Sequence, residues 1–156
     1  MGTQIENIAN FLQISARLAT AGQPTVEQYP AIVNAGYTLV INLALNDSPN
    51  ALANEATIAR ELGLEYIQIP VEWDAPTLAD FQAFRTVMDA HPEDKIFVHC
   101  AANKRVSAFV YLYRICQGVD ESIARQDLTK IWTLNEIWVK FIDRVRSSIS
   151  DDCGKI

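Results

Sequence analysis

The feature that most constrains the fold is a set of short apolar runs that alternate with helix-like segments. Residues 38–43 and 95–99 are nearly continuous apolar runs of strand length, and residues 65–69 form another strand-like run. Segments with helix-start and helix-stop signals lie between and after them. Strands that alternate with helices predict a mostly parallel sheet with helices on both faces. We therefore expect one three-layer α/β/α domain over residues 1–156, with a sheet of four or five strands.

Helix boundaries are marked by capping residues. Thr25 is followed three residues later by Gln28, and Thr77 by Asp80, which is the pattern of a side chain that caps the start of a helix. Gly36 is a favourable stop for the first of these helices. The remaining predicted elements are an opening helix at 3–11, a short strand at 17–20, and helices at 52–62, 106–117, 121–131 and 134–148.

Composition excludes several classes of protein. The chain has 156 residues, of which 49% are hydrophobic and 21% charged, and these are ordinary values for a globular domain. No segment approaches the roughly 18 apolar residues that a membrane span requires. The net charge of −6 argues against a nucleic-acid partner. Residues 1–10 do not resemble a signal peptide, so we expect a cytoplasmic protein, with export left open if a leader was trimmed.

The cysteines and histidines do not form a structural metal or disulfide pattern. Cys100, Cys116 and Cys153 are far apart, odd in number and without CxxC spacing. His91 and His99 are the only histidines, so a histidine-rich metal site is not expected. We predict no metal and no organic cofactor, and we expect chemistry at one cysteine only.

Chemistry is concentrated in residues 96–109, where a predicted strand is followed by a short loop and a helix start. The strand would deliver Cys100 to the carboxyl edge of the sheet, where open α/β folds bind their ligands. The N–H groups of the loop and the first helical turn would converge on one point, and the guanidinium of Arg105 would add charge suited to a phosphate-like group. The same field favours the nucleophilic thiolate of Cys100. The predicted anion cradle consists of Ala101, Ala102, Asn103, Lys104, Arg105 and Val106.

This segment resembles the signature of cysteine-dependent tyrosine and dual-specificity phosphatases. The resemblance is carried by His99 and Cys100, followed by Arg105 and Ser107. Upstream, residues 18–24, 36–37 and 40–43 are similar to a bacterial branch of that superfamily, the beta-lactamase-hydrolase-like phosphatases, some of which are discussed as sulfur carriers. The resemblance covers about residues 14–117 and implies a fold like that of the phosphotyrosine phosphatases, with a phosphorylated protein or small molecule as substrate.

The resemblance also implies roles for individual residues. Cys100 would attack phosphorus and form a cysteinyl-phosphate, and Arg105 would hold the phosphoryl oxygens. Ser107 would stabilise the leaving thiolate when water cleaves that intermediate. His99 would orient the loop through hydrogen bonds. The general acid would come from the loop at 71–76.

Asp74 is the predicted general acid, because phosphatases of this superfamily supply it from a separate loop upstream of the cysteine. The segment 71–76, between a strand and a helix, occupies that place in the chain. Glu72 is the second choice.

The spacing between cysteine and arginine departs from the phosphatase pattern. Four residues separate Cys100 from Arg105, whereas the pattern has five, and Val106 holds the usual arginine position. Asn103 replaces a frequent glycine, although asparagine tolerates the left-handed conformation better than most residues. A gap of four is the spacing of rhodanese-like sulfurtransferases. Two other functions therefore stay open: a sulfurtransferase with a persulfide on Cys100, and a non-catalytic module that binds a phosphorylated ligand.

Overall fold

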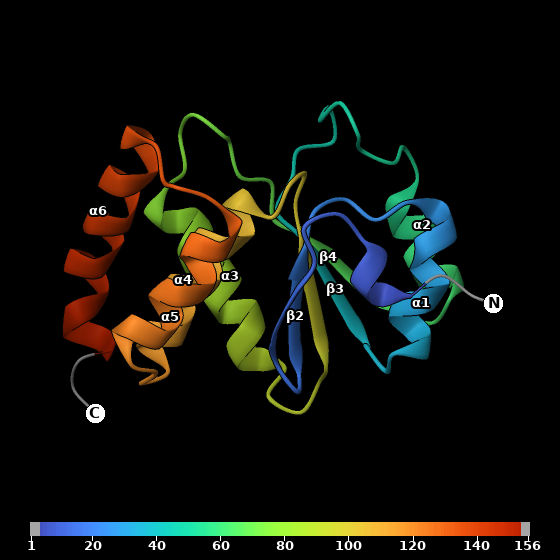
Figure 1. Ribbon diagram of the computed structural model, residues 1–156, viewed down its shortest axis with the longest axis horizontal. Helices are drawn as coiled ribbons and strands as arrows, with labels where there is room; N and C mark the ends of the chain where they lie inside the picture. Colours follow the sequence, from blue (N-terminus) through green and yellow to red (C-terminus); the bar gives the residue numbers. More distant parts are fainter. Residues whose placement is uncertain (1–3, 154–156) are drawn as a thin grey trace.

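The computed structural model describes residues 4–153, which form a five-stranded sheet between two layers of helices (Figure 1). The strand order is β1-β2-β5-β3-β4. Only β1 and β2 are antiparallel, and the other neighbouring strands are parallel. The predicted three-layer fold with a mostly parallel sheet is confirmed. The strands are β1 (Leu12–Ser15), β2 (Leu18–Ala21), β3 (Leu39–Asn42), β4 (Glu65–Gln68) and β5 (Ile96–His99).

The helices divide between the two faces of the sheet (Figure 1). One face carries the 3-10 helices η1 (Ile5–Asn7) and η2 (Val26–Gln28) with α1 (Tyr29–Asn34) and α2 (Glu55–Glu61). The other face carries α3 (Leu78–Ala90), α4 (Lys104–Cys116), α5 (Glu121–Ile131) and α6 (Glu136–Cys153). No helix within residues 4–153 combines the length and the apolar character that crossing a bilayer would require.

Successive residues of the central strands contribute to two separate hydrophobic cores, because successive side chains in a strand point to opposite faces of the sheet. In β3, Leu39 and Ile41 belong to the core under α3–α6, whereas Val40 belongs to the core under α1 and α2. All three are fully buried. The sheet is therefore covered on both faces, as its apolar runs predicted.

Both predicted capping motifs are present. The Thr25 side chain accepts the Gln28 N–H at 3.2 Å, and the Thr77 side chain accepts the Asp80 N–H at 3.1 Å. In return, the backbone N–H of each threonine donates to the side chain of its partner, Gln28 or Asp80. Gly36 ends the segment after α1 with a φ of 95°, a conformation that favours glycine.

The predicted opening helix at 3–11 is wrong. Within its described part only η1 is helical, since Ile8 is extended and Asn10 has a φ of 53°. Ile5 and Ile8 are instead buried in the core under α1 and α2, which a compact turn allows. Strand β1, which follows directly, was not predicted. The helix expected from residue 106 begins two residues earlier, at Lys104.

Candidate active site

Cys100 follows β5 at the carboxyl edge of the sheet. Strand β5 pairs with β2 on one side and with β3 on the other, so Cys100 emerges at the centre of the sheet. Cys100 is almost fully buried, and its backbone N–H donates to the Ala21 carbonyl at 3.3 Å. A depression of about 280 Å³ opens above it and is lined by Trp73, Cys100, Ala101, Ala102, Lys104 and Arg105.

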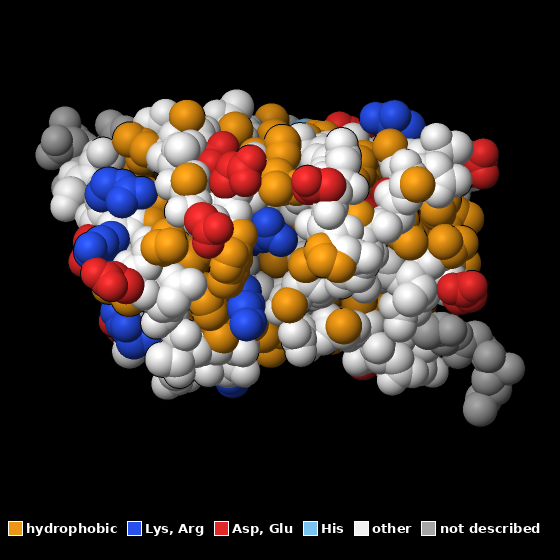
Figure 2. Space-filling model, turned by 90° about the horizontal axis from the view of Figure 1, so that it is seen from above, with side chains coloured by type: hydrophobic (Ala, Val, Ile, Leu, Met, Phe, Trp, Pro, Cys, Tyr) orange, Lys and Arg blue, Asp and Glu red, His pale blue; other side chains and the backbone are white. Residues whose placement is uncertain are grey.

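This edge of the sheet faces the viewer in Figure 2. Lys and Arg side chains lie near the middle of the face beside apolar side chains, with Asp and Glu side chains around them and further Lys and Arg side chains toward the rim. The acidic net charge of −6 is compatible with a local positive site, because Lys104 and Arg105 line the depression and no Asp or Glu of the described residues does. A local positive region of this kind suits an anionic ligand.

The carbonyl groups of the loop after Cys100 are held by neighbouring segments. The Ala101 carbonyl accepts the Gln23 N–H at 3.1 Å and the Asn50 side-chain amide at 3.2 Å. The Ala102 carbonyl accepts the Asn10 side-chain amide at 2.9 Å. In a trans peptide the carbonyl and the next N–H point in opposite directions. These anchors therefore turn the following N–H groups away from the neighbouring segments.

Several N–H groups of the loop have no acceptor within the described part of the chain. Among residues 4–153, none accepts a hydrogen bond from the N–H of Ala101, Ala102, Lys104, Arg105 or Val106. The last three belong to the first turn of α4, whose N–H groups are left free by helix geometry and carry its positive end. Free donors beside a depression at a helix start can bind an anion.

Asn103 gives the loop its turn into α4. It has a φ of 67°, and its side chain is fully buried. Its Nδ2 donates to the Asn10 carbonyl at 2.8 Å and to Thr20 Oγ1 at 3.0 Å. Because asparagine tolerates the left-handed conformation, Asn103 can occupy the position where the family frequently has glycine. Asn103 shapes the loop from behind, and its side chain does not line the depression.

Arg105 lines the depression, whereas Val106 does not. Arg105 is 6% exposed and donates from Nη1 to the Val71 carbonyl at 3.0 Å. Its guanidinium carbon is 6.0 Å from the centre of the Trp73 ring. Val106, at the usual arginine position of the phosphatase pattern, is fully buried in the core under α3–α6. With the offset of one residue, Arg105 lines the depression and Val106 lies in the core.

Three other predicted residues, Ser107, Asp74 and Glu72, do not line the depression. Ser107 Oγ donates to the Lys104 carbonyl at 2.7 Å and accepts from Trp132 Nε1 at 3.0 Å, and it does not line the depression. Asp74 and Glu72 are exposed residues of the loop that contributes Trp73 to the wall. The roles expected for these three residues stay predictions. Within the described residues, no cluster of His, Cys, Asp or Glu is arranged to hold a metal ion.

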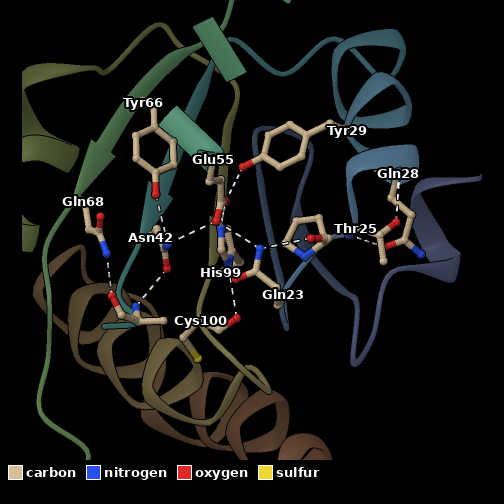
Figure 3. Close-up of polar contacts among 12 residues, drawn as sticks. Gln23, Thr25, Gln28, Tyr29, Asn42, Glu55, Tyr66, Gln68, His99 and Cys100 are labelled. Carbon is tan, nitrogen blue, oxygen red and sulfur yellow. Dashed lines mark hydrogen bonds and ion pairs between the residues drawn. The ribbon is translucent and has the colours of Figure 1, made fainter. Parts of the chain in front are cut away.

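Glu55 is a central residue of the buried network behind the loop, and sequence reasoning missed it (Figure 3). It is 4% exposed, and His99 is fully buried. Glu55 Oε2 lies 2.5 Å from His99 Nε2 and accepts the Tyr29 hydroxyl. Its Oε1 accepts from Gln23 Nε2 at 3.0 Å and from Asn42 Nδ2 at 3.4 Å. In the sequence, Glu55 looks like an ordinary acidic residue at a helix start.

The partners of Glu55 keep it ionised. Burial acts to raise the pKa of Glu55, but the hydrogen bond and charge of His99 and the hydrogen bonds from Tyr29 and Gln23 outweigh burial and lower that pKa. Burial, and then the Glu55 charge, raises the pKa of Tyr29, and the same two causes raise the pKa of Tyr66 to about 12. Both tyrosines therefore stay protonated near neutral pH and can donate hydrogen bonds.

Comparison with known proteins identifies the family. Residues 4–136 match the model of the PTP-NADK family, described as a DSP-PTPase phosphatase fused to NAD+ kinase. The chain belongs to this family. Its membership in the PTP-NADK family confirms the resemblance to cysteine-based phosphatases.

Relatives of this PTP-NADK family chain include bacterial proteins of the branch that the sequence resembled. The beta-lactamase hydrolase-like protein of Xylella fastidiosa (strain Temecula1) is 32% identical over 121 residues, which are 76% of this chain and 27% of that protein. The chain thus spans about a quarter of the length of this curated relative. The crystal structure of a DUF442 protein from Shewanella putrefaciens CN-32 is 32% identical, with a TM-score of 0.86 over 92% of this chain and 95% of that chain.

A more distant structure shares the fold alone. PTPMT1 in complex with PI(5)P has a TM-score of 0.78 at 16% identity, over 92% of this chain and 98% of that chain. The three-layer α/β/α architecture is therefore that of the cysteine-based phosphatases.

Proposed function

We propose that this chain hydrolyses phosphate monoesters through a cysteinyl-phosphate intermediate on Cys100. The observation that carries the proposal is the loop after Cys100. The Ala101 and Ala102 carbonyls are engaged by neighbouring segments. The N–H groups of these two residues and of residues 104–106 have no acceptor within the described chain. Membership in a phosphatase family supports the same reaction class.

The reaction has two displacements at phosphorus. In the first, the Cys100 thiolate forms an S–P bond while the P–O bond to the leaving group breaks, and Asp74 gives its proton to the departing oxygen. In the second, water attacks phosphorus and gives a proton to Asp74 while the S–P bond breaks. The products are an alcohol, inorganic phosphate and the regenerated thiolate. Ser107 would stabilise that thiolate after its hydroxyl rotates away from the Lys104 carbonyl.

Charge stabilisation would come from the loop and Arg105. A guanidinium has five N–H donors, and Arg105 has one hydrogen bond within the described chain, to the Val71 carbonyl. Its remaining donors can reach toward phosphoryl oxygens in the depression that Arg105 lines. Donors that are already in place when charge develops lower the barrier more than donors that must reorganise.

The experiment compares two substrates. An aryl phosphate should be hydrolysed by the wild type but not by Cys100→Ser, whereas thiosulfate with cyanide should give little thiocyanate. Cys116→Ala, a change at a second buried cysteine, is the matched control and should keep turnover. An aryl group is chosen because Trp73 forms part of the wall.

The two other functions predict different results in the same experiment. Thiocyanate formation together with a persulfide on Cys100, seen by mass spectrometry, would assign a sulfurtransferase. Binding of inorganic phosphate without any turnover would assign a phospho-ligand-binding module. Either result would overturn the proposal.

A further inference from the structure

We propose that Glu55 is a positioning residue that acts through His99 on Cys100 and its loop. The carboxylate lies behind the loop, on the first residue of α2, and it does not line the depression. Its predicted effect on turnover rests on the function proposed above, but its effect on the thiol does not.

Both ring nitrogens of His99 face oxygen atoms. Nδ1 lies 3.2 Å from the Cys100 carbonyl oxygen, which can only accept, so this nitrogen carries hydrogen. Nε2 lies 2.5 Å from Glu55 Oε2. That carboxylate also receives hydrogen bonds from Tyr29, Gln23 and Asn42, so it acts as an acceptor on both oxygens. Nε2 therefore also carries hydrogen, and His99 is an imidazolium paired with the Glu55 carboxylate.

The pair is sealed from solvent. His99 is fully buried and Glu55 is 4% exposed, so neither charge is solvated, and each depends on the other. Removing one member of a buried ion pair leaves an uncompensated charge. Without the carboxylate, the imidazole would lose its second proton and with it the positive charge beside Cys100.

This arrangement has two consequences at Cys100. The imidazolium, on the residue next to Cys100, favours the thiolate over the thiol. Its Nδ1 also holds the Cys100 carbonyl, and in a trans peptide the next N–H, that of Ala101, points the opposite way. The Glu55–His99 pair therefore contributes to the charge of the nucleophile and to the direction of the first donor in the loop.

Other ionisable groups around the pair keep one protonation state near neutral pH. Tyr29 reaches Glu55 from α1, and its pKa is raised by burial and by the Glu55 charge. Tyr66 reaches the network from β4 by accepting a hydrogen bond from Asn42 Nδ2 at 3.0 Å. Burial and then the Glu55 charge raise the pKa of Tyr66 to about 12, with Arg60 acting in the opposite direction. The charge in this network is therefore that of Glu55 and His99.

The test uses Glu55→Gln in the full chain. Glutamine keeps the shape of the side chain but removes the charge and turns an amide donor toward groups that are themselves donors. Alkylation of Cys100 by iodoacetate near neutral pH should slow by about tenfold or more, because less thiolate is present. Turnover of an aryl phosphate should fall as well. Glu61→Gln, which removes the same charge from the exposed end of α2, should change neither quantity.

A double variant tests whether Glu55 acts through His99. If it does, Glu55→Gln combined with His99→Gln should alkylate no more slowly than the slower single variant, because both changes remove one pair. A folded Glu55→Gln chain that alkylates at the wild-type rate would overturn the inference. This holds even if its thermal stability is lower, since the role of Glu55 would then be structural only. Additive slowing in the double variant would also overturn it.

If the Glu55→Gln chain does not fold, a measurement on the wild type still tests the inference. The ¹⁵N chemical shifts of His99 near neutral pH should be those of two protonated ring nitrogens, and the other histidine, His91, can be identified by His91→Gln. The shifts of a neutral tautomer would overturn the inference. Neither alkylation nor these shifts require a substrate. A wild type with the expected thiol and shifts but no turnover would therefore refute the proposed function alone.

Discussion

Gly22 is the position where the smallest change should disturb the loop most. The Gly22 N–H donates to the Ala9 carbonyl at 2.7 Å, and the next N–H, that of Gln23, donates to the Ala101 carbonyl. A Cβ at residue 22 would lie 2.8 Å from the Ala101 oxygen and 3.2 Å from Ala102 Cα. Both contacts are with backbone, so no side chain can rotate away. Gly22→Ala must therefore push the loop away from β2.

The size of the effect follows from these distances. Ordinary contact with a Cβ begins near 3.4 Å, so the Ala101 carbonyl must move by about 0.6 Å. Overpacking of this kind costs about 1–3 kcal/mol of stability. A misplacement of about 1 Å can cost on the order of 100-fold in rate, so we expect aryl phosphate turnover to fall by at least about tenfold. Alkylation of Cys100 should also change, because the loop donors near the thiolate move.

Gly63→Ala is the matched control for this prediction. Gly63 has a φ of 86°, and an added Cβ would meet nothing within 4 Å. The variant should lose about 1–2 kcal/mol of stability through backbone strain while leaving the loop in place. Turnover per folded molecule should stay at the wild-type value. A folded Gly22→Ala chain with wild-type turnover and alkylation would refute the reasoning about the loop.

Three further predictions concern the guanidinium, the buried carboxylate and the core. Arg105→Ala should lower aryl phosphate turnover by about 100- to 1,000-fold, and Arg105→Lys should restore little because an ammonium cannot make a paired contact. Steady-state kinetics, with circular dichroism as a folding control, would contradict this if the turnover of Arg105→Ala stayed within a few-fold of the wild type. Because the pKa of Glu55 is lowered in the folded protein, the ionised carboxylate stabilises the fold above the ordinary value of 4.5, and this stabilisation is lost as the pH falls below it. The difference in unfolding free energy between wild type and Glu55→Gln, measured by urea titration, should therefore shrink in acid. A difference that grows in acid would contradict this prediction. Phe109 is fully buried and packs against Phe81, Phe84 and Phe141. Phe109→Ala should therefore lower the free energy of unfolding by about 3–5 kcal/mol in the same titration, and a loss below about 1 kcal/mol would be inconsistent with this packing.

Elements whose signals are local were predictable from the sequence. The capping pairs that begin at Thr25 and Thr77 act over three residues, and the apolar run around β3 is contiguous. Each signal depends on neighbours in the chain, so a pattern can express it. The position of Cys100 at a sheet edge followed from the same local pattern, since a strand, a short loop and a helix start are adjacent in sequence.

Strand β1 was missed because its stabilisation is not local. Leu12–Ser15 is half-exposed, and it pairs only with β2 across residues 16 and 17, which include neither glycine nor asparagine. Hairpin turns of two residues are usually recognised by those residue types. The opening helix was wrong for a related reason, because Ile5 and Ile8 gain more from the core under α1 and α2 than from a helix of their own.

Glu55 could not be found from the sequence because its environment is assembled from five separate segments. Glu55 itself lies on α2, and its hydrogen-bond partners come from α1, β3, β5 and the segment after β2 that contains Gln23. An acidic residue at a helix start is normally solvated, and nothing nearby in the chain marks this one as buried. The local departure at Arg105, by contrast, was visible in the sequence, but the structure was needed to show that Arg105 lines the depression and that Val106 lies in the core.

The anchors of the loop also bear on how the protein folds. Asn10 and Asn50 hold the loop across 92 and 51 residues of chain, and Arg105 reaches Val71 across 34. Contacts of such long sequence separation form late, because the entropy of closing the intervening chain must be lost first. The helices can form earlier from local contacts, but the loop gains its shape only when the N-terminal segment has docked. Recovery of anion binding during refolding should therefore lag behind recovery of helical structure.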